Sequence, residues 1–266
     1  MKLAFLFLIY DTILQEELWE QFFRGVDPAK YTIMIHYKWQ KPLKYFEQYK
    51  MEKCIPTEYI TDTSIGRVQL MMIEAAFKDP DVYKTINLSQ SCIPLKSFDH
   101  VYEFLTRDVM SHFNTMPMSD WSNDVTECAT QYVPRPQIHK AANWFILNRA
   151  HATTCVEHPE YFTYFEHVHS PEEFMFLTLL KAHRPEEIQY THYSAEGATT
   201  FTNWDQSWGM VYKYPCYASI KTYATISEEE LLYLIESPCL FGRKFTASCT
   251  VGDRLLRDYP FKFTPE

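Results

Sequence analysis

Continuous apolar runs alternate with amphipathic stretches over the first third of the chain. The run Leu3–Tyr10 is apolar throughout, which is typical of a strand buried on both faces. The segment Glu16–Phe23 then places its apolar side chains at helical spacing, as does Ile65–Phe77. Further strands are predicted at Tyr31–Tyr37, Glu58–Ile60 and Tyr83–Leu88. Strands that alternate with helices predict a parallel sheet, in which ligands lie beyond the carboxyl ends of the strands.

The pattern is less regular in the rest of the chain. We expect helices at Ser97–Thr106, Ala141–Thr153 and Glu228–Ile235, and a strand or edge segment at Thr200–Trp204. Between Val109 and Pro136 the periodicity breaks down, and prolines and aromatic residues predict a long loop that covers a site or is a surface insertion. Since the chain has only six glycines and no low-complexity linker, we predict a single α/β domain.

Composition and charge exclude several classes of function. The net charge of −9 argues against a general nucleic-acid binder, so any anionic ligand must meet a local basic cluster. No apolar run is long enough to span a bilayer, so the chain as given is expected to be soluble. Seven cysteines without a C-x-x-C pair predict neither a cysteine zinc site nor a complete disulfide framework, and they favour a reducing compartment.

Two adjacent acidic residues stand near the start of the stretch 170–178, which reads Ser-Pro-Glu-Glu-Phe-Met-Phe-Leu-Thr. Ser170 is predicted to cap a helix with Pro171 in its first turn, and Glu173 then occupies the acidic position of a capping box. In such a box the carboxylate bonds only a backbone N–H, so the spacing alone does not make Glu173 catalytic. The same pattern recurs at 227–230, where we infer no catalytic role.

Six short blocks follow one another along the chain in the order of a known family. They are Leu3–Leu8 followed by Leu18–Phe23, Ile33–His36, Leu88–Leu95, Asn143–Phe145 leading to Arg149, Ser170–Phe174, and Leu240–Phe245. With these blocks the chain resembles the core-2/I-branching β-1,6-N-acetylglucosaminyltransferase family, glycosyltransferase family 14, which has xylosyltransferase and plant glucuronosyltransferase relatives. One block alone would be a weak signal, but six in order over nearly the whole chain are specific.

The resemblance implies one GT-A-like domain over residues 1–266, Rossmann-like and with a mostly parallel sheet. Residues 1–108 would form the nucleotide-sugar-binding half and residues 109–266 the acceptor and catalytic half. The implied activity moves N-acetylglucosamine, xylose or glucuronate from a UDP donor to a hydroxyl of a carbohydrate or glycoprotein. The transfer inverts the anomeric centre, and neither a metal nor another cofactor is expected. Family members usually follow a Golgi membrane anchor, whereas this chain begins at its first strand, so we expect a trimmed or an anchorless, cytoplasmic form.

The resemblance also assigns the catalytic and charge-neutralising residues. Glu173 matches the general base, which takes the proton of the acceptor hydroxyl as that oxygen attacks the anomeric carbon. Glu172 is interpreted as structural or as orienting the acceptor. Lys244, with Arg243 beside it, and Lys221 match the basic residues that stabilise the departing diphosphate. Lys221 stands where the branching enzymes carry an arginine, and lysine cannot form the same two parallel hydrogen bonds.

The resemblance assigns two further residues, one to the donor and one to the acceptor. His36 follows a predicted strand and would lie near the uridine, although a histidine at a strand end is often only a hydrogen-bonded structural group. Trp204 matches a tryptophan that contacts the acceptor. The remaining acceptor contacts would fall in the predicted loop 109–136, where no block matches.

Two motifs bear on the expectation that no metal is bound. Many GT-A enzymes hold a cation with a D-x-D that follows a central strand, but the corresponding Ser89-Gln90-Ser91 has no carboxylate. Asp79-Pro80-Asp81 is a literal D-x-D that precedes its strand, so we interpret it as a turn. His167-Val168-His169 lacks a nearby third ligand in the sequence, so its two histidines are interpreted as polar side chains at the surface.

The sequence also allows two other functions. The chain could be a carbohydrate-binding relative that has kept the fold and lost the chemistry. A glycoside hydrolase would need two carboxyl groups across one glycosidic bond, and adjacent helical residues such as Glu172 and Glu173 point in different directions.

Overall fold

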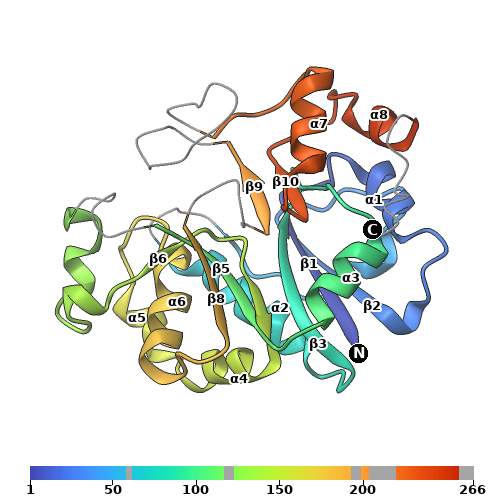
Figure 1. Ribbon diagram of the computed structural model, residues 1–266. Helices are drawn as coiled ribbons and strands as arrows, with labels where there is room; N and C mark the ends of the chain where they lie inside the picture. The colour runs from blue at the N-terminus through green and yellow to red at the C-terminus, as the bar shows by residue number, and fades with distance from the viewer. Residues whose placement is uncertain (58–61, 117–122, 193–198, 204–219, 258–266) are drawn as a thin grey trace.

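The computed structural model describes residues 1–57, 62–116, 123–192, 199–203 and 220–257 (Figure 1). Within these ranges a seven-stranded sheet crosses the molecule, with helices on both of its faces. Its order is β2 (Tyr31–Tyr37), β1 (Lys2–Ile9), β3 (Val82–Ser89), β7 (Ile146–Asn148), β5 (Ser111–Met116) and β6 (Lys140–Ala141), and β8 (Ile188–His192) also pairs with β5. The helices are α1 (Glu16–Phe23), α2 (Ser64–Ala76), α3 (Phe98–Thr106), α4 (Arg149–Glu157), α5 (Glu160–Tyr164), α6 (Glu172–His183), α7 (Glu228–Glu236) and α8 (Val251–Arg257).

The long pairings of this sheet are parallel. Strand β1 runs parallel to both β2 and β3, and β5 runs parallel to β8. Short antiparallel pairings join β7 to β3 and β5, and β6 to β5. The predicted α/β class with a mostly parallel central sheet is therefore confirmed. The predicted strands at β1, β2 and β3 and the helices at α1, α2, α3 and α7 are also confirmed, whereas Glu58–Ile60 lies outside the described residues.

Strand β1 is apolar throughout because both of its faces are covered. Ala4 and Leu6 belong to the core cluster shared with α2, α4 and α6. Leu3, Phe5 and Phe7 alternate with them and belong to a second cluster with α1 and α3. Since successive strand residues point to opposite faces, this alternation buries β1 between two layers of helices.

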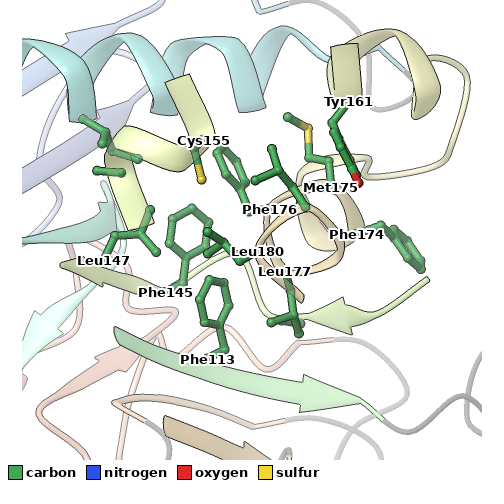
Figure 2. Packing of buried hydrophobic residues seen from close by; sticks show 14 of the residues in the cluster. Phe113, Phe145, Leu147, Cys155, Tyr161, Phe174, Met175, Phe176, Leu177 and Leu180 are labelled. Carbon is green, nitrogen blue, oxygen red and sulfur yellow. The ribbon is translucent and has the colours of Figure 1, made fainter. Parts of the chain in front are cut away.

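Helix α6 is buried along most of its length, and Figure 2 shows several of its side chains within the apolar cluster. Phe176 packs on Phe145 with a ring-centroid distance of 4.8 Å, and Phe145 in turn stacks on Phe113 of β5 at 5.3 Å. Leu177 and Leu180 complete the same cluster. Because interiors are packed as densely as organic crystals, these contacts hold α6 and its first turn in one position against the sheet.

A second, three-stranded sheet lies beyond the carboxyl ends of β1 and β3 (Figure 1). It consists of β4 (Ile93–Pro94), β10 (Phe241–Arg243) and β9 (Thr200–Thr202), so the strand predicted from Thr200 is confirmed. Leu95, Phe201 and Phe245 pack with the apolar faces of α7 and α8 into a third cluster. This small sheet brings the residues after β10 next to the loop after β3, since the N–H of Phe245 donates to the carbonyl of Ser91 at 2.9 Å.

Three predicted local structures are wrong. Ala141–Thr153 is not one helix: Ile146–Asn148 forms β7, and Asn148 Oδ1 then accepts from the N–H of His151 at 2.8 Å to cap α4. The predicted loop from Val109 to Pro136 contains strand β5. The predicted capping box at α6 is absent, because Ser170 has a φ of 54° and α6 has no side-chain cap. The carbonyl of Ser170, rather than its hydroxyl, accepts from the N–H of Glu173 at 3.0 Å.

Candidate active site

A cavity of about 700 Å³ opens at the carboxyl ends of β1 and β3. Its lining includes the end of β1 at 8–10, the loop after β3 at 89–91, the first turn of α6 at 172–173, and residues 243–245. In open α/β sheets this is where ligands bind, because loops from several strands converge there. The cavity therefore lies where the sequence analysis expects a ligand to bind.

Glu173 lines this cavity and forms an ion pair with a second lining residue. Its Oε2 is 3.2 Å from Nζ of Lys140 in β6, and the two side chains are 21% and 15% exposed, respectively. The carboxylate therefore does not serve a capping box, which was the structural alternative for this residue. It stays partly open to the cavity, and a hydroxyl that enters can reach it.

Glu172 lines the same wall but is in a different electrostatic state. The residue is only 7% exposed. The pKa of the Glu172 carboxyl is raised to about 8, chiefly by burial and also by the nearby Glu173 and Asp62, while a backbone hydrogen bond and Lys140 act in the opposite direction. At neutral pH Glu172 is therefore mostly protonated, and its carboxyl group can donate a hydrogen bond.

Two further basic residues, Arg243 and Lys244, also line the cavity. The Arg243 guanidinium lies over the ring of Trp144, with Cζ 4.0 Å from the ring centroid, and both residues line the cavity. Lys244 follows Arg243 and is half-buried. Burial lowers the pKa of Lys244, and the neighbouring Arg243 lowers it further. These two cations form the local basic cluster that an anionic ligand requires in a chain of net charge −9.

The loop after β3 supplies hydroxyl and amide groups to the cavity but no carboxylate. Ser89 Oγ lies 3.1 Å from Ser91 Oγ, and both serines line the cavity. Oε1 of Gln90 accepts from the N–H of Tyr10 at 2.7 Å, and the Gln90 carbonyl accepts from the N–H of Leu14 at 2.9 Å. Gln90 thus ties the loop after β3 to the loop after β1.

Two of the remaining predicted site residues, His36 and Lys221, are not among the residues that line the cavity. His36 is fully buried next to Leu8 of β1, and its Nε2 accepts from the N–H of Ile55 at 2.9 Å. Lys221 lies between two cavity residues, but its Nζ contacts both carboxylate oxygens of Glu230 at 3.0 and 3.1 Å. Trp204 lies outside the described residues. The roles assigned to these three residues stay predictions.

Asp79-Pro80-Asp81 is a turn, as predicted. It joins α2 to β3, and Asp79 Oδ2 accepts from Lys2 Nζ at 2.7 Å. Arg149 fixes the same turn, since its guanidinium donates to the carbonyls of Phe77, Asp79 and Val82 at 2.7–2.9 Å. Arg149, which belongs to one of the six sequence blocks, therefore has a structural role here.

Sequence reasoning missed Lys140 and Trp144 as site residues. Trp144 was visible as part of the Asn143–Phe145 block, but the predicted helix gave it no position in a site. A single sequence carries no signal that would pair Lys140 with Glu173, because that contact exists only once β6 and α6 pack together. Asn143 also lines the cavity, and its Oδ1 accepts from Gln69 Nε2 at 2.6 Å, which fixes this segment against α2.

Comparison with known proteins identifies the relatives of this chain. Residues 3–231 match the family model described as Core-2/I-Branching enzyme. Glycosyltransferase BC10 of Oryza sativa subsp. japonica is 22% identical over 166 residues, which cover 60% of this chain and 41% of the rice protein. The match thus spans less than half of that relative's length. A solved structure of the galactosyltransferase LgtC with donor and acceptor sugar analogues covers 98% of each chain at 8% identity, with a TM-score of 0.43. Among the described helices, none has the length and apolar character needed to cross a membrane.

Proposed function

Because the chain belongs to the core-2/I-branching enzyme family of glycosyltransferases, we propose that it transfers a sugar from a UDP donor to a hydroxyl of a carbohydrate or glycoprotein, with inversion and without a catalytic metal. The observation that carries this proposal is the sharing of one cavity by Glu173, Arg243 and Lys244. N-acetylglucosamine, xylose and glucuronate are the donor sugars to test.

The proposed reaction is a single displacement. The acceptor oxygen bonds to the anomeric carbon as the bond from that carbon to the diphosphate oxygen breaks, and UDP leaves with the electron pair. Glu173 takes the proton of the acceptor hydroxyl, so the attacking oxygen gains nucleophilicity as its bond forms. One displacement inverts the anomeric centre, so the reaction requires no carboxylate nucleophile.

The two cations would stabilise the charge that develops on the diphosphate. Lys244 and Arg243 are partly removed from water, where an ammonium or guanidinium interacts more strongly with an oxyanion than at the surface. The packing of Arg243 on Trp144 fixes the guanidinium before the substrate binds. The protonated Glu172 would donate a hydrogen bond to a substrate oxygen beside the general base.

The decisive experiment compares Glu173→Gln with the control Glu103→Gln, which makes the same change at an exposed position of α3. Each variant is assayed for UDP release with the three UDP-sugars and a mixed glycan acceptor, and UDP binding is measured by calorimetry. We expect Glu173→Gln to lower kcat by about 10²–10⁴-fold, with unchanged UDP affinity. Retained activity of Glu173→Gln would overturn the role of this base.

Two further results would overturn the proposed function itself. A folded wild-type protein that binds glycans but turns over none of the donors would be a binding protein. Cleavage of an aryl glycoside in the absence of any UDP-sugar would instead identify a hydrolase.

A further inference from the structure

We infer a divalent-metal site suited to zinc, formed by His158, Glu160 and His183. Ligand atoms of these three side chains all lie within 4.8 Å of one another. The residues are not among those that line the cavity, and His183 is ten residues after Glu173 on α6, about 15 Å along the helix axis. The inference does not depend on the proposed glycosyl transfer.

The three side chains stand at the ends of three consecutive helices whose positions are fixed by the core. His158 follows the last residue of α4, Glu160 is the first residue of α5, and His183 is the last residue of α6. Tyr161 and Phe162 of α5 are buried against α6. Because packed elements hold the ligands, only side-chain movement is needed to close the site.

The distances are compatible with zinc after a small closing movement. In a tetrahedral zinc site the ligand atoms lie about 3.3 Å apart, at bond lengths of about 2.0–2.2 Å. His158 Nδ1 and Glu160 Oε1 are already 2.9 Å apart. The largest separation in the group, at most 4.8 Å, would have to shorten by about 1.5 Å. On metal binding, the metal replaces the proton that His158 Nδ1 shares with Glu160.

Tyr161 supplies the outer contact that metal-binding histidines usually have. Its hydroxyl lies 3.3 Å from His183 Nε2, and Figure 2 shows Tyr161 beside α6. When Nε2–H donates to this hydroxyl, Nδ1 of His183 carries the lone pair that binds the metal. Tyr161 would therefore fix the tautomer of the ring.

The rings of the two histidines would have to reorient for both to bind one metal. The rings of His158 and His183 are stacked, with centroids 3.6 Å apart and an interplanar angle of 22°. Nitrogen lone pairs lie in the ring planes, so those of nearly parallel rings do not converge on one point. Since His183 is exposed and ends its helix, it can tilt toward the metal.

The ligand set selects the kind of metal and its role. Two imidazoles and one carboxylate suit zinc and its neighbours in the first transition row, whereas magnesium and calcium prefer oxygen ligands throughout. Three protein ligands leave the fourth position to water. A metal here would join the α4–α5 junction to the end of α6, and so stabilise the helix whose first turn carries Glu172 and Glu173.

The test is a zinc titration of the full chain, stripped with EDTA and dialysed, by calorimetry and thermal shift at pH 7.5. We expect one Zn²⁺ per chain, a raised Tm, and Co²⁺ substitution that gives the intense visible absorption of a tetrahedral site. His183→Ala and Glu160→Gln should each weaken binding at least tenfold. The control His100→Ala, at an exposed histidine of α3, should bind as the wild type does.

Two results would overturn the inference. One is no stoichiometric binding by the wild type at millimolar zinc. The other is equal binding by wild type, His183→Ala and Glu160→Gln, which would assign the metal to other histidines among the ten in the chain. His183 is exposed, so its alanine variant is expected to fold, and circular dichroism checks this.

Discussion

The ammonium group of Lys140 in β6 lies 3.2 Å from a carboxylate oxygen of Glu173 in the first turn of α6, inside the cavity. Both side chains are mostly shielded from water, so this ion pair is stronger than a surface pair. The contact holds the carboxylate of the proposed general base in one orientation. An entering hydroxyl would approach a carboxylate that is already positioned.

We predict that Lys140→Met lowers kcat about tenfold and leaves the KM for the donor unchanged. The reason is that Glu173 would lose the contact that orients its carboxylate, and a misplacement of about 1 Å in a reacting group costs up to about 10²-fold in rate. Lys140→Arg should recover part of the loss. Steady-state kinetics of both variants, with the exposed Lys78→Met as control, check the prediction. A change confined to the donor KM would show that Lys140 contacts the donor instead.

Lys244 and Lys221 are expected to behave differently when each is replaced by alanine. Lys244 lines the cavity, and removing one group that stabilises an oxyanion lowers kcat by about 10²–10³-fold. Lys221 is paired with the buried Glu230, whose charge would lose its partner in Lys221→Ala. We expect that variant to lose about 3 kcal/mol of stability but to keep its activity per folded molecule.

Kinetics and urea denaturation of both alanine variants separate these effects. Should Lys221→Ala lose donor affinity without losing stability, the role that the resemblance assigned to Lys221 would stand. A stable, fully active Lys244→Ala would mean that other groups neutralise the diphosphate.

Glu172 should make the stability of the protein depend on pH. Its pKa is raised from 4.5 to about 8, so between these pH values the folded chain holds a proton that the unfolded chain has released. The stabilisation from this proton is fully present below about pH 4.5 and is lost as the pH rises toward 8. Glu172→Gln has a neutral side chain throughout, so it lacks this loss.

We therefore predict that the free energy of unfolding of wild type, relative to Glu172→Gln, falls between pH 5 and pH 8 by up to about 1.4 kcal/mol per pH unit. Urea denaturation at each pH measures the difference. The control Glu103→Gln, at an exposed position, should show a difference that does not vary with pH. A flat difference for Glu172→Gln would mean that its carboxyl is ionised in the folded state.

The first strands and helices of the fold could be predicted because the pattern of apolar residues alone indicates which of their residues are buried. Strand β1 is buried on both faces, so every residue from Leu3 to Ile9 is apolar and the pattern is unambiguous. Strand β5 was missed because Ser-His-Phe-Asn-Thr-Met has polar residues at buried positions. Ser111 is fully buried, yet its Oγ accepts from the N–H of Asn148 at 2.8 Å and lies 2.7 Å from His151 Nδ1. Only tertiary partners make such a strand possible.

The candidate site also has features that the sequence predicted and features that it could not predict. The motifs led to Glu172, Glu173, Arg243 and Lys244, which all line one cavity. The backbone at Ser170 could not be predicted, because its positive φ of 54° replaces the extended conformation of an ordinary N-cap. Consequently the sequence pattern placed Glu173 in a capping box within its own helix, whereas in the structure its carboxylate pairs with Lys140 of β6.

Metal removal should affect stability and turnover in different ways. The loop after β3 offers Ser89, Gln90 and Ser91 but no carboxylate, and Asp79 is bound to Lys2 in a turn at the start of the same strand. The proposed reaction relies on Lys244 and Arg243 for the diphosphate, so we predict that EDTA leaves kcat unchanged well below the melting temperature. EDTA should nevertheless lower Tm if zinc occupies the site at His158, Glu160 and His183. Loss of turnover in EDTA that Mn²⁺ restores, with Tm unchanged, would show that a cation acts at the diphosphate.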